Sequence, residues 1–302
     1  MRPGSRLFVG MAIAIALSGA GFMAASAKAP EPPAWARYDA PAPVRILGYN
    51  DDAMEPFLSR DGATLFFNNR NSPPDKTDLH WAERVDDLTF RYRGRVEGAN
   101  SPKLDGVATM SAGDRFCYIS VRSYFESLAT VYCGDWSHGR LENVALQSEA
   151  AVRVLGRVVF DIEIDASGRS MILADGLFRG GPVPVSSDLR QARLVDGTFR
   201  LNPEDDPLFA AVNSRALEYA AALSTDGLTL SFTRMTGPPP FSSATIWIAR
   251  RPRASDAFGP PVQIRVIRGF AEAATFTPDG RALYFHRRTN NRFTLWRTVR
   301  AP

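Results

Sequence analysis

The sequence predicts an all-β fold, a five-bladed β-propeller closed by an N-terminal strand that completes the last blade. Three observations predict it. A fourteen-residue unit recurs five times, each copy has the pattern of a two-stranded hairpin, and further strand-like segments follow each copy before the next one starts. Four antiparallel strands in each repeat of fifty-odd residues are typical of a propeller blade.

The repeated unit is defined by its apolar columns. Successive copies start 52, 54, 59 and 53 residues apart. We number them repeats one to five: Met54–Phe67, Gly106–Ile119, Phe160–Leu173, Tyr219–Phe232 and Glu272–Phe285. One column holds Leu58, Met110, Ile164, Leu223 and Phe276; two others hold Leu65, Cys117, Met171, Leu230 and Leu283, then Phe67, Ile119, Leu173, Phe232 and Phe285. The last two columns are two residues apart, so they share one face of a strand.

A turn lies between the apolar columns of each unit. It reads Asp61-Gly62, Ser167-Gly168, Asp226-Gly227 and Asp279-Gly280 in four copies. Glycine supplies the positive φ that a tight hairpin needs, and Asp or Ser bonds the local backbone. The second copy has the reversed pair Gly113-Asp114, so its turn is expected to differ in type.

Further strands are expected after each hairpin. Third strands are predicted at Asp78–Ala82, Thr130–Cys133, Thr245–Ala249 and Thr294–Arg297, with a weak equivalent near Asp188–Leu194; fourth strands are predicted at Arg95–Glu97, Leu141–Leu146 and Val262–Ile267. The fifth repeat has no outer strand of its own. Because Pro43–Glu55 resembles Pro261–Glu272, we expect Val44–Leu47 to pair beside Thr294–Arg300 and remove the open edge. An open arc or another blade count is the alternative.

Aspartate-glycine turns flanked by such strands resemble the PD40 (WD40-like) repeats of TolB-type β-propellers. The resemblance covers about Val44 to Arg300, and it depends on five short copies in register rather than on any one of them. The chain departs from TolB itself, which has six such blades and a separate N-terminal domain. The resemblance implies a β-propeller.

The first 27 residues have the pattern of a secretory signal peptide. Arg2 and Arg6 precede an apolar run, and Ala25-Ser26-Ala27 is a small-x-small site for cleavage after Ala27. The alternative is an uncleaved membrane anchor. Residues 28–43 are rich in Pro and Ala and are expected to form an extended or disordered tether, with the propeller occupying 44–302. These features predict a periplasmic or secreted protein with no membrane span after cleavage.

Composition excludes several functional classes. The formal charge is +4, and it falls to +2 without Arg2 and Arg6, which is far from the basic field of a nucleic-acid binder. Three histidines leave little room for a His-rich metal cage, so we predict neither a metal nor a cofactor. The chain is expected to be a monomer.

The two cysteines lie in neighbouring strands of one predicted blade. Cys117 is in the second strand of repeat two and Cys133 in the third. With the connecting loop centred near Phe125, the two face each other across adjacent strands. An exported protein favours a disulfide, in which the Cα atoms are usually about 4.4–6.8 Å apart. The alternative is a pair of buried thiols in core positions.

Charged residues recur at one end of every predicted blade. An acid stands at or near the start of each unit, and an arginine follows the second strand in four of them; these residues are Glu55, Asp105, Asp161, Glu218, Glu272, Arg70, Arg122, Arg234 and Arg287. Around a central channel they would form a polar funnel for a cation, a sugar or a peptide. Alternatively, each acid pairs with an arginine of a neighbouring blade and fixes the packing between blades.

Irregular loops on the same face offer aromatic side chains. These are Tyr124, Phe125, Phe178 and Phe241. Aromatic faces of this kind suit contact with sugars or proteins. The alternative is that the aromatic residues cap the blade ends.

From these residues we expect an exported, non-catalytic propeller that binds an envelope protein or a carbohydrate. The alternative is a glycoside hydrolase that uses carboxylates at the channel mouth, with Glu55, Asp161 and Glu218 as candidates. Such enzymes need acids about 5–9.5 Å apart, one of them with a raised pKa. The sequence has no nucleophile elbow, zinc-binding helix or phosphate loop.

Overall fold

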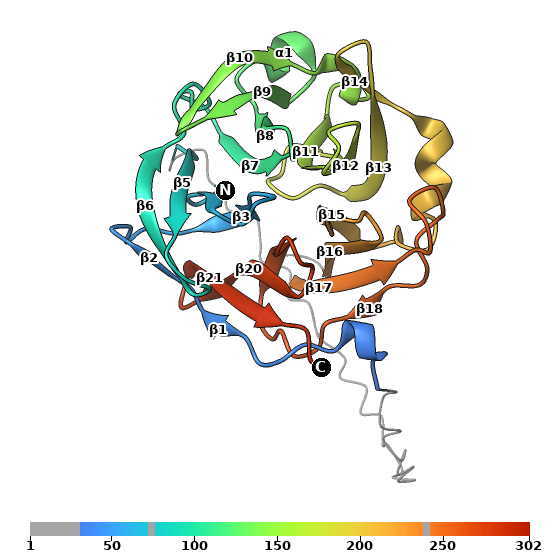
Figure 1. Ribbon diagram of the computed structural model, residues 1–302. Helices are drawn as coiled ribbons and strands as arrows, with labels where there is room; N and C mark the ends of the chain where they lie inside the picture. The colour runs from blue at the N-terminus through green and yellow to red at the C-terminus, as the bar shows by residue number, and fades with distance from the viewer. Residues whose placement is uncertain (1–30, 72–75, 238–241) are drawn as a thin grey trace, which may run out of the picture. The chain divides into compact units, whose positions relative to one another are not determined.

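Strands arranged around a common centre form the described part of the chain. The computed structural model describes residues 31–71, 76–237 and 242–302, and those from Pro32 onward belong to one compact unit. Figure 1 views this unit along the axis of the ring, with β3, β7, β11 and β15 toward the centre and β6, β10, β14 and β18 toward the rim. The signal-peptide prediction and Phe241 lie outside the described residues.

Every predicted hairpin is present, as an inner and a second strand paired antiparallel. The inner strands are β3 (Met54–Leu58), β7 (Asp105–Met110), β11 (Arg157–Ile164), β15 (Leu217–Leu223) and β19 (Ala271–Phe276). The second strands are β4 (Thr64–Asn68), β8 (Arg115–Ser120), β12 (Ser170–Leu177), β16 (Thr229–Thr236) and β20 (Ala282–Thr289). The turn glycine Gly62 has φ +74°, and in the reversed copy Asp114 takes the left-handed conformation instead, with φ +60°.

Third and outer strands complete each repeat. The third strands are β5 (Leu79–Arg84), β9 (Val131–Ser137), β13 (Ser186–Val195), β17 (Ser243–Arg250) and β21 (Arg292–Val299); the outer strands are β6 (Thr89–Arg95), β10 (Arg140–Leu146), β14 (Thr198–Leu201) and β18 (Val262–Gln263). The outer strand predicted at 262–267 is shorter than expected because the chain turns after Gln263 to bury Ile264 and Ile267. The short helical turns are η1 (Ala34–Ala36), α1 (Tyr124–Ser127), η3 (Ser148–Ala150) and η4 (Pro203–Phe209).

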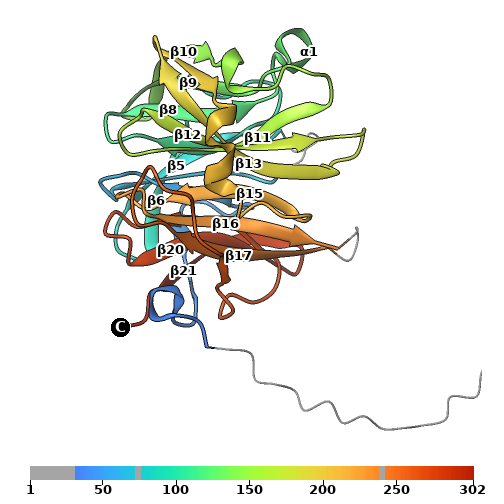
Figure 2. The same ribbon diagram turned by 90° about the vertical axis from the view of Figure 1, so that its right-hand side faces the viewer.

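The strands of repeats one, two and five each form a separate sheet. Repeats three and four share one eight-stranded sheet, joined by a single parallel pair between Ser187 and Leu217. Figure 2, turned by 90°, shows the strands as stacked layers. Between the layers, apolar residues of neighbouring repeats pack together; one such core holds Phe57 and Phe66 of repeat one with Phe116 and Tyr118 of repeat two.

The N-terminal segment closes the last sheet, but with a different register from the predicted one. Strand β1 (Ala42–Pro43) pairs antiparallel with β21, and the Val44 N–H donates to the Leu295 carbonyl at 2.9 Å. The next residues, β2 (Arg45–Leu47), pair parallel with β6 of repeat one instead. Val44 and Ile46 pack into the apolar seam between the first and last repeats, so the segment bridges both of them.

Residues 32–43 do not form a free tether. Ala36 and Tyr38 are buried, Tyr38 bridges to Arg300, and the Ala301 N–H donates to the Arg37 carbonyl at 2.9 Å. The expected extended or disordered tether is therefore not free at these residues, because Ala36 and Tyr38 pack into the core beside the last repeat. Both views place this segment beside the C-terminus.

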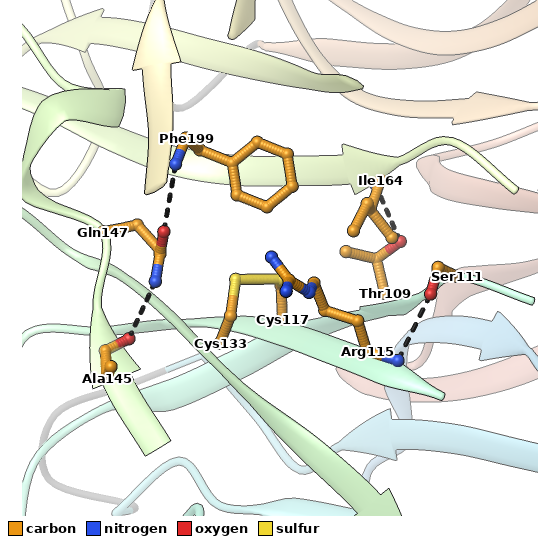
Figure 3. Close-up of a disulfide and its surroundings, with 9 residues drawn as sticks. All are labelled: Thr109, Ser111, Arg115, Cys117, Cys133, Ala145, Gln147, Ile164 and Phe199. Atoms are coloured by element: carbon orange, nitrogen blue, oxygen red, sulfur yellow. Dashed lines mark hydrogen bonds between the residues drawn. A yellow bond between two sulfur atoms is a disulfide. The ribbon is translucent and has the colours of Figure 1, made fainter. Parts of the chain in front are cut away.

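Cys117 and Cys133 are cross-strand partners in β8 and β9, and they form a disulfide with Cα atoms 4.1 Å apart. The bridge is buried in the core shared by repeats two and three, where Phe199 packs in the same cluster (Figure 3). Gln147 holds the Phe199 backbone by accepting its N–H at 3.1 Å. The disulfide is therefore a core element.

Candidate functional site

A β-bulge interrupts each inner strand near its start. The pairing register shifts between Met54 and Phe57 in repeat one and at the equivalent place in repeats two, four and five. In repeat three it shifts one residue earlier, between Val159 and Asp161. The second residue of the unit takes a positive φ in four repeats: Glu55, Val107, Ala220 and Ala273, at 49–57°. Bulges re-aim side chains and are common beside active sites. The residue at this position therefore decides what faces the channel.

Two of the five predicted acids come just before the bulge and form buried ion pairs. Asp105 pairs with Arg122 at 2.9 Å, and Glu218 pairs with Arg234 at 2.6 Å. Each acid also accepts hydrogen bonds from the serine four residues earlier. Each pair lies within a single repeat, repeat two for Asp105 and repeat four for Glu218. The expectation that the acids pair with an arginine of a neighbouring blade is therefore wrong for these two. Glu218 is consequently removed from the catalytic candidates.

The other three acids, Glu55, Asp161 and Glu272, lie at the bulge and meet at the channel mouth. All three are buried. Glu55 accepts a hydrogen bond from the Asn71 amide at 3.1 Å, and Glu272 accepts one from the Tyr219 hydroxyl. Asp161 accepts backbone hydrogen bonds from Ile162 and Ala220. Within the described ranges, no lysine or arginine pairs with any of the three.

These three carboxyl groups line one pocket of about 210 Å³, which we call the acid pocket. Every repeat contributes to its wall. The lining includes Glu55 and Asn71 of repeat one, Val107 of repeat two, Phe160, Asp161 and Phe178 of repeat three, Tyr219 and Met235 of repeat four, and Glu272 of repeat five. The Phe160 ring lies 5.7 Å from the rings of both Phe178 and Tyr219, measured between centroids. One side of the acid pocket is therefore aromatic.

Burial controls the ionisation of the acid pocket. It raises the pKa of Glu55 to about 8, and the nearby carboxyls of Asp161 and Glu272 add to the rise, while His286 opposes it. Burial, with the charge of Glu163, also raises the pKa of Asp161 well above its ordinary value. Glu55 is therefore mainly protonated at neutral pH.

His286 connects two of the acids, a role that the sequence did not reveal. Its Nδ1 accepts the Glu55 backbone N–H at 3.1 Å, so the ring proton is on Nε2, which donates to Glu272 at 3.1 Å. Asn68 and Thr233 occupy the equivalent position in repeats one and four, and each accepts the bulge N–H of the following repeat. The His286–Glu55 bond is the same contact between the last repeat and the first.

The remaining predicted residues lie outside this cluster. Arg70 pairs with Asp52 at 2.6 Å rather than with Glu55, and the Arg287 guanidinium lies over the Trp296 ring. The Tyr124 hydroxyl bonds the backbone of residues 156–157, whereas Phe125 is 85% exposed. Of the loop aromatic residues that the structure describes, Phe178 alone lines the acid pocket.

Two further findings concern membranes and metal ions. Across the described ranges, no helix is long and apolar enough to cross a membrane. In the same residues, no group of three or more His, Cys, Asp or Glu side chains is arranged to hold a metal ion.

The chain is similar to known β-propellers in fold but not in sequence. No family model matches it, and no curated protein does. Similar solved structures include BT0996 in its RGII complex, with a TM-score of 0.57, 14% identity, and coverage of 88% of this protein and 92% of the other. The Cellvibrio cellulosa alpha-L-arabinanase complexed with arabinohexaose has a TM-score of 0.53, 14% identity, and coverage of 82% and 91%.

A third similar structure is Zg3597, a family 117 glycoside hydrolase of Zobellia galactanivorans. Its TM-score is 0.54 at 11% identity, with coverage of 87% of this protein and 90% of the other. A TolB structure from Agrobacterium tumefaciens also matches, at a TM-score of 0.46, too low to support the PD40 resemblance. At these identities the comparisons establish an all-β propeller fold, which many glycoside hydrolases share with this protein.

Proposed function

We propose that the protein is a glycoside hydrolase that acts in the acid pocket. The observation that carries the proposal is the meeting of Glu55, Asp161 and Glu272 in one pocket, as three buried carboxyls with no arginine partner among the residues that the structure describes. Glycosidases work with carboxyl groups of different ionisation on either side of the scissile bond. The fold of the similar structures supports this hypothesis better than the non-catalytic binding module favoured by the sequence alone.

The contacts suggest a different role for each carboxyl. Glu55, with its pKa raised to about 8, carries a proton at neutral pH and is the proposed general acid. Glu272 accepts hydrogen bonds through both oxygens, from Tyr219 and His286, which is the pattern of an ionised carboxylate. We assign to it the negative charge that faces the developing oxocarbenium ion. Asp161 lies beside both, and burial raises its pKa as it does that of Glu55, so its carboxyl is assigned no negative charge in this scheme.

A five-bladed ring is part of the same proposal. Each repeat supplies one inner strand, and all five line a single narrow channel beneath the acid pocket. The bond from His286 to Glu55 joins repeat five to repeat one as the equivalent bonds join earlier neighbours. We infer that each repeat is one blade.

Hydrolysis of a glycan panel tests the function. The panel holds arabinohexaose, xylohexaose, galacto-oligosaccharides and rhamnogalacturonan II fragments, chosen partly from the ligands named for the similar structures. We expect the wild type to release reducing sugar from at least one substrate. Glu55→Gln should lower kcat about 10²–10⁴-fold, as for other general acids. The exposed Glu126→Gln is the control. No hydrolysis, or full activity of Glu55→Gln, would contradict the proposal.

We also propose that the protein is exported and cleaved after Ala27, and acts as a monomer in the periplasm or outside the cell. The evidence is the charged, apolar and small-residue pattern of residues 1–27. Mass spectrometry of the protein purified from its native compartment should show an N-terminus at Lys28. A retained Met1 in a membrane fraction would support the anchor alternative.

A further inference from the structure

The acid pocket lies at the centre of the ring of repeats. Its wall includes side chains from every repeat, from Glu55 in the first to Glu272 in the last. The carboxyls are therefore surrounded by side chains of all five repeats.

The acid pocket is closed at its base. Beneath the carboxyls the central channel leaves a cavity of only about 20 Å³. Small residues of the inner strands, such as Ala221 and Ala274, form much of its lining. Arg60 reaches across the channel from the first-repeat turn. It pairs with Glu163 at 2.9 Å and donates to the carbonyls of Met110, Ile164 and Leu223. A glycan therefore has no path through the ring.

The space suits one sugar ring. A volume of about 210 Å³ lies below the roughly 300–1,000 Å³ typical of pockets for drug-sized ligands. It corresponds to about seven water molecules at roughly 30 Å³ each. The rings of Phe160 and Phe178 give one wall an apolar face. Gly176 allows both rings to pack there, since a Cβ at this position would lie 2.7 Å from Phe160 and 3.1 Å from Phe178.

The described lining of the acid pocket offers no cationic partner to an acidic sugar. It contains three carboxyl groups and no lysine or arginine. A uronate placed here would bury its carboxylate beside Glu55, Asp161 and Glu272 without a cationic partner, which is costly in a low-dielectric site. Neutral hydroxyl groups, in contrast, can bond these acids and Asn71.

From this geometry we propose that the acid pocket takes the single, uncharged terminal residue of a glycan chain, so that the protein acts from chain ends. The proposal rests on the carbohydrate function above and specifies its substrate class and its mode of attack. A polymer can place its reactive linkage beside the carboxyls only by inserting one end.

The test uses neutral hexasaccharides of the panel, the same glycans capped at both ends with a bulky aromatic group, and hexagalacturonate. Products are separated by chromatography over time, and binding to Glu55→Gln is measured by calorimetry. We expect single residues to be released first from free-ended glycans. Capped glycans and hexagalacturonate should be neither bound nor cleaved.

The outcomes separate this inference from the proposed function. Early internal fragments, or cleavage of capped glycans, would overturn end-binding and leave hydrolysis standing. Binding of free-ended but not capped glycans, without cleavage, would support end-binding and overturn hydrolysis. Preferred binding of hexagalacturonate would overturn the uncharged specificity. Absence of both binding and cleavage for every probe would overturn both proposals.

A matched pair of glycine variants links the result to the acid pocket. Gly176→Ala should displace Phe160 and Phe178 and weaken binding of the glycan end at least tenfold. Gly113→Ala adds the same methyl group where no atom lies within 4 Å, and it should bind as the wild type does. Thermal unfolding checks that both variants fold. Phe178→Ala, which removes the wall without strain, should weaken binding as well; unchanged binding by both pocket variants would refute the assignment.

Discussion

Replacing Glu55 by glutamine should flatten the pH dependence of stability. Burial raises the pKa of Glu55 from 4.5 to about 8, so between these pH values the folded protein holds a proton that the unfolded chain releases. The free energy of unfolding therefore falls as pH rises through this window. At about 1.36 kcal/mol for each pKa unit, the full effect is on the order of 5 kcal/mol, a large part of the 5–15 kcal/mol typical of a folded protein. Glutamine has the same shape and does not titrate.

Urea unfolding of the wild type and Glu55→Gln at pH 5, 6, 7, 8 and 9 measures this effect. The unfolding free energy of the wild type should decline more steeply than that of the variant between pH 5 and 8, and the two curves should run parallel above that range. The exposed Glu126→Gln should follow the wild type. If Glu55→Gln also follows the wild type at every pH, Glu55 is ionised in the folded protein and cannot be the general acid.

Four other variants test the remaining contacts. His286→Ala and Thr233→Ala each remove one equivalent bond between repeats, so each should lower the free energy of unfolding in urea by about 1–3 kcal/mol. Only His286→Ala, which also removes a hydrogen bond to Glu272, should change the pH profile of kcat. A similar change in Thr233→Ala would refute the positioning role of His286. Glu218→Ala leaves Arg234 buried and unpaired and should cost about 3–5 kcal/mol while activity per folded molecule is kept; lost activity in a fully folded sample would return Glu218 to the catalytic candidates. Replacing Cys117 and Cys133 by alanine opens a loop with a sequence separation of 16 residues and should cost about 3 kcal/mol; an unchanged melting temperature would show that the bridge contributes nothing.

The sequence predicts the hairpins well because their pattern is local. Apolar residues two apart and a turn residue with positive φ determine each hairpin, as Leu65, Phe67 and Gly62 do in repeat one. The closing strand was misplaced by a few residues. Its register depends on packing of Val44 and Ile46 against two repeats at once, and one repeat considered alone does not contain that information.

The acids illustrate why the site was harder to predict. All five stand near the start of a unit. The two acids in ion pairs come directly before the unit, whereas the three acids of the acid pocket lie one or two residues later, at the bulge. The bulge leaves little trace in the sequence, since Glu55, Val107, Ala220 and Ala273 have nothing in common except their backbone. One local signal was available: Asp105 and Glu218 each follow a serine by four residues and precede an arginine by 16 or 17.

Equivalent positions explain how a repeated scaffold acquires a single site. The residue after the last apolar column is Asn68 in repeat one and Thr233 in repeat four, and each only holds the next bulge. In repeat three this residue is Ala174, whose side chain has no hydrogen-bond acceptor. The Asp161 carboxyl accepts the Ala220 backbone N–H instead. In repeat five it is His286, whose second nitrogen reaches Glu272. The bonds that hold the ring together thus also orient two of the three carboxyls, so substitutions that close the ring more tightly should also affect the chemistry of the acid pocket.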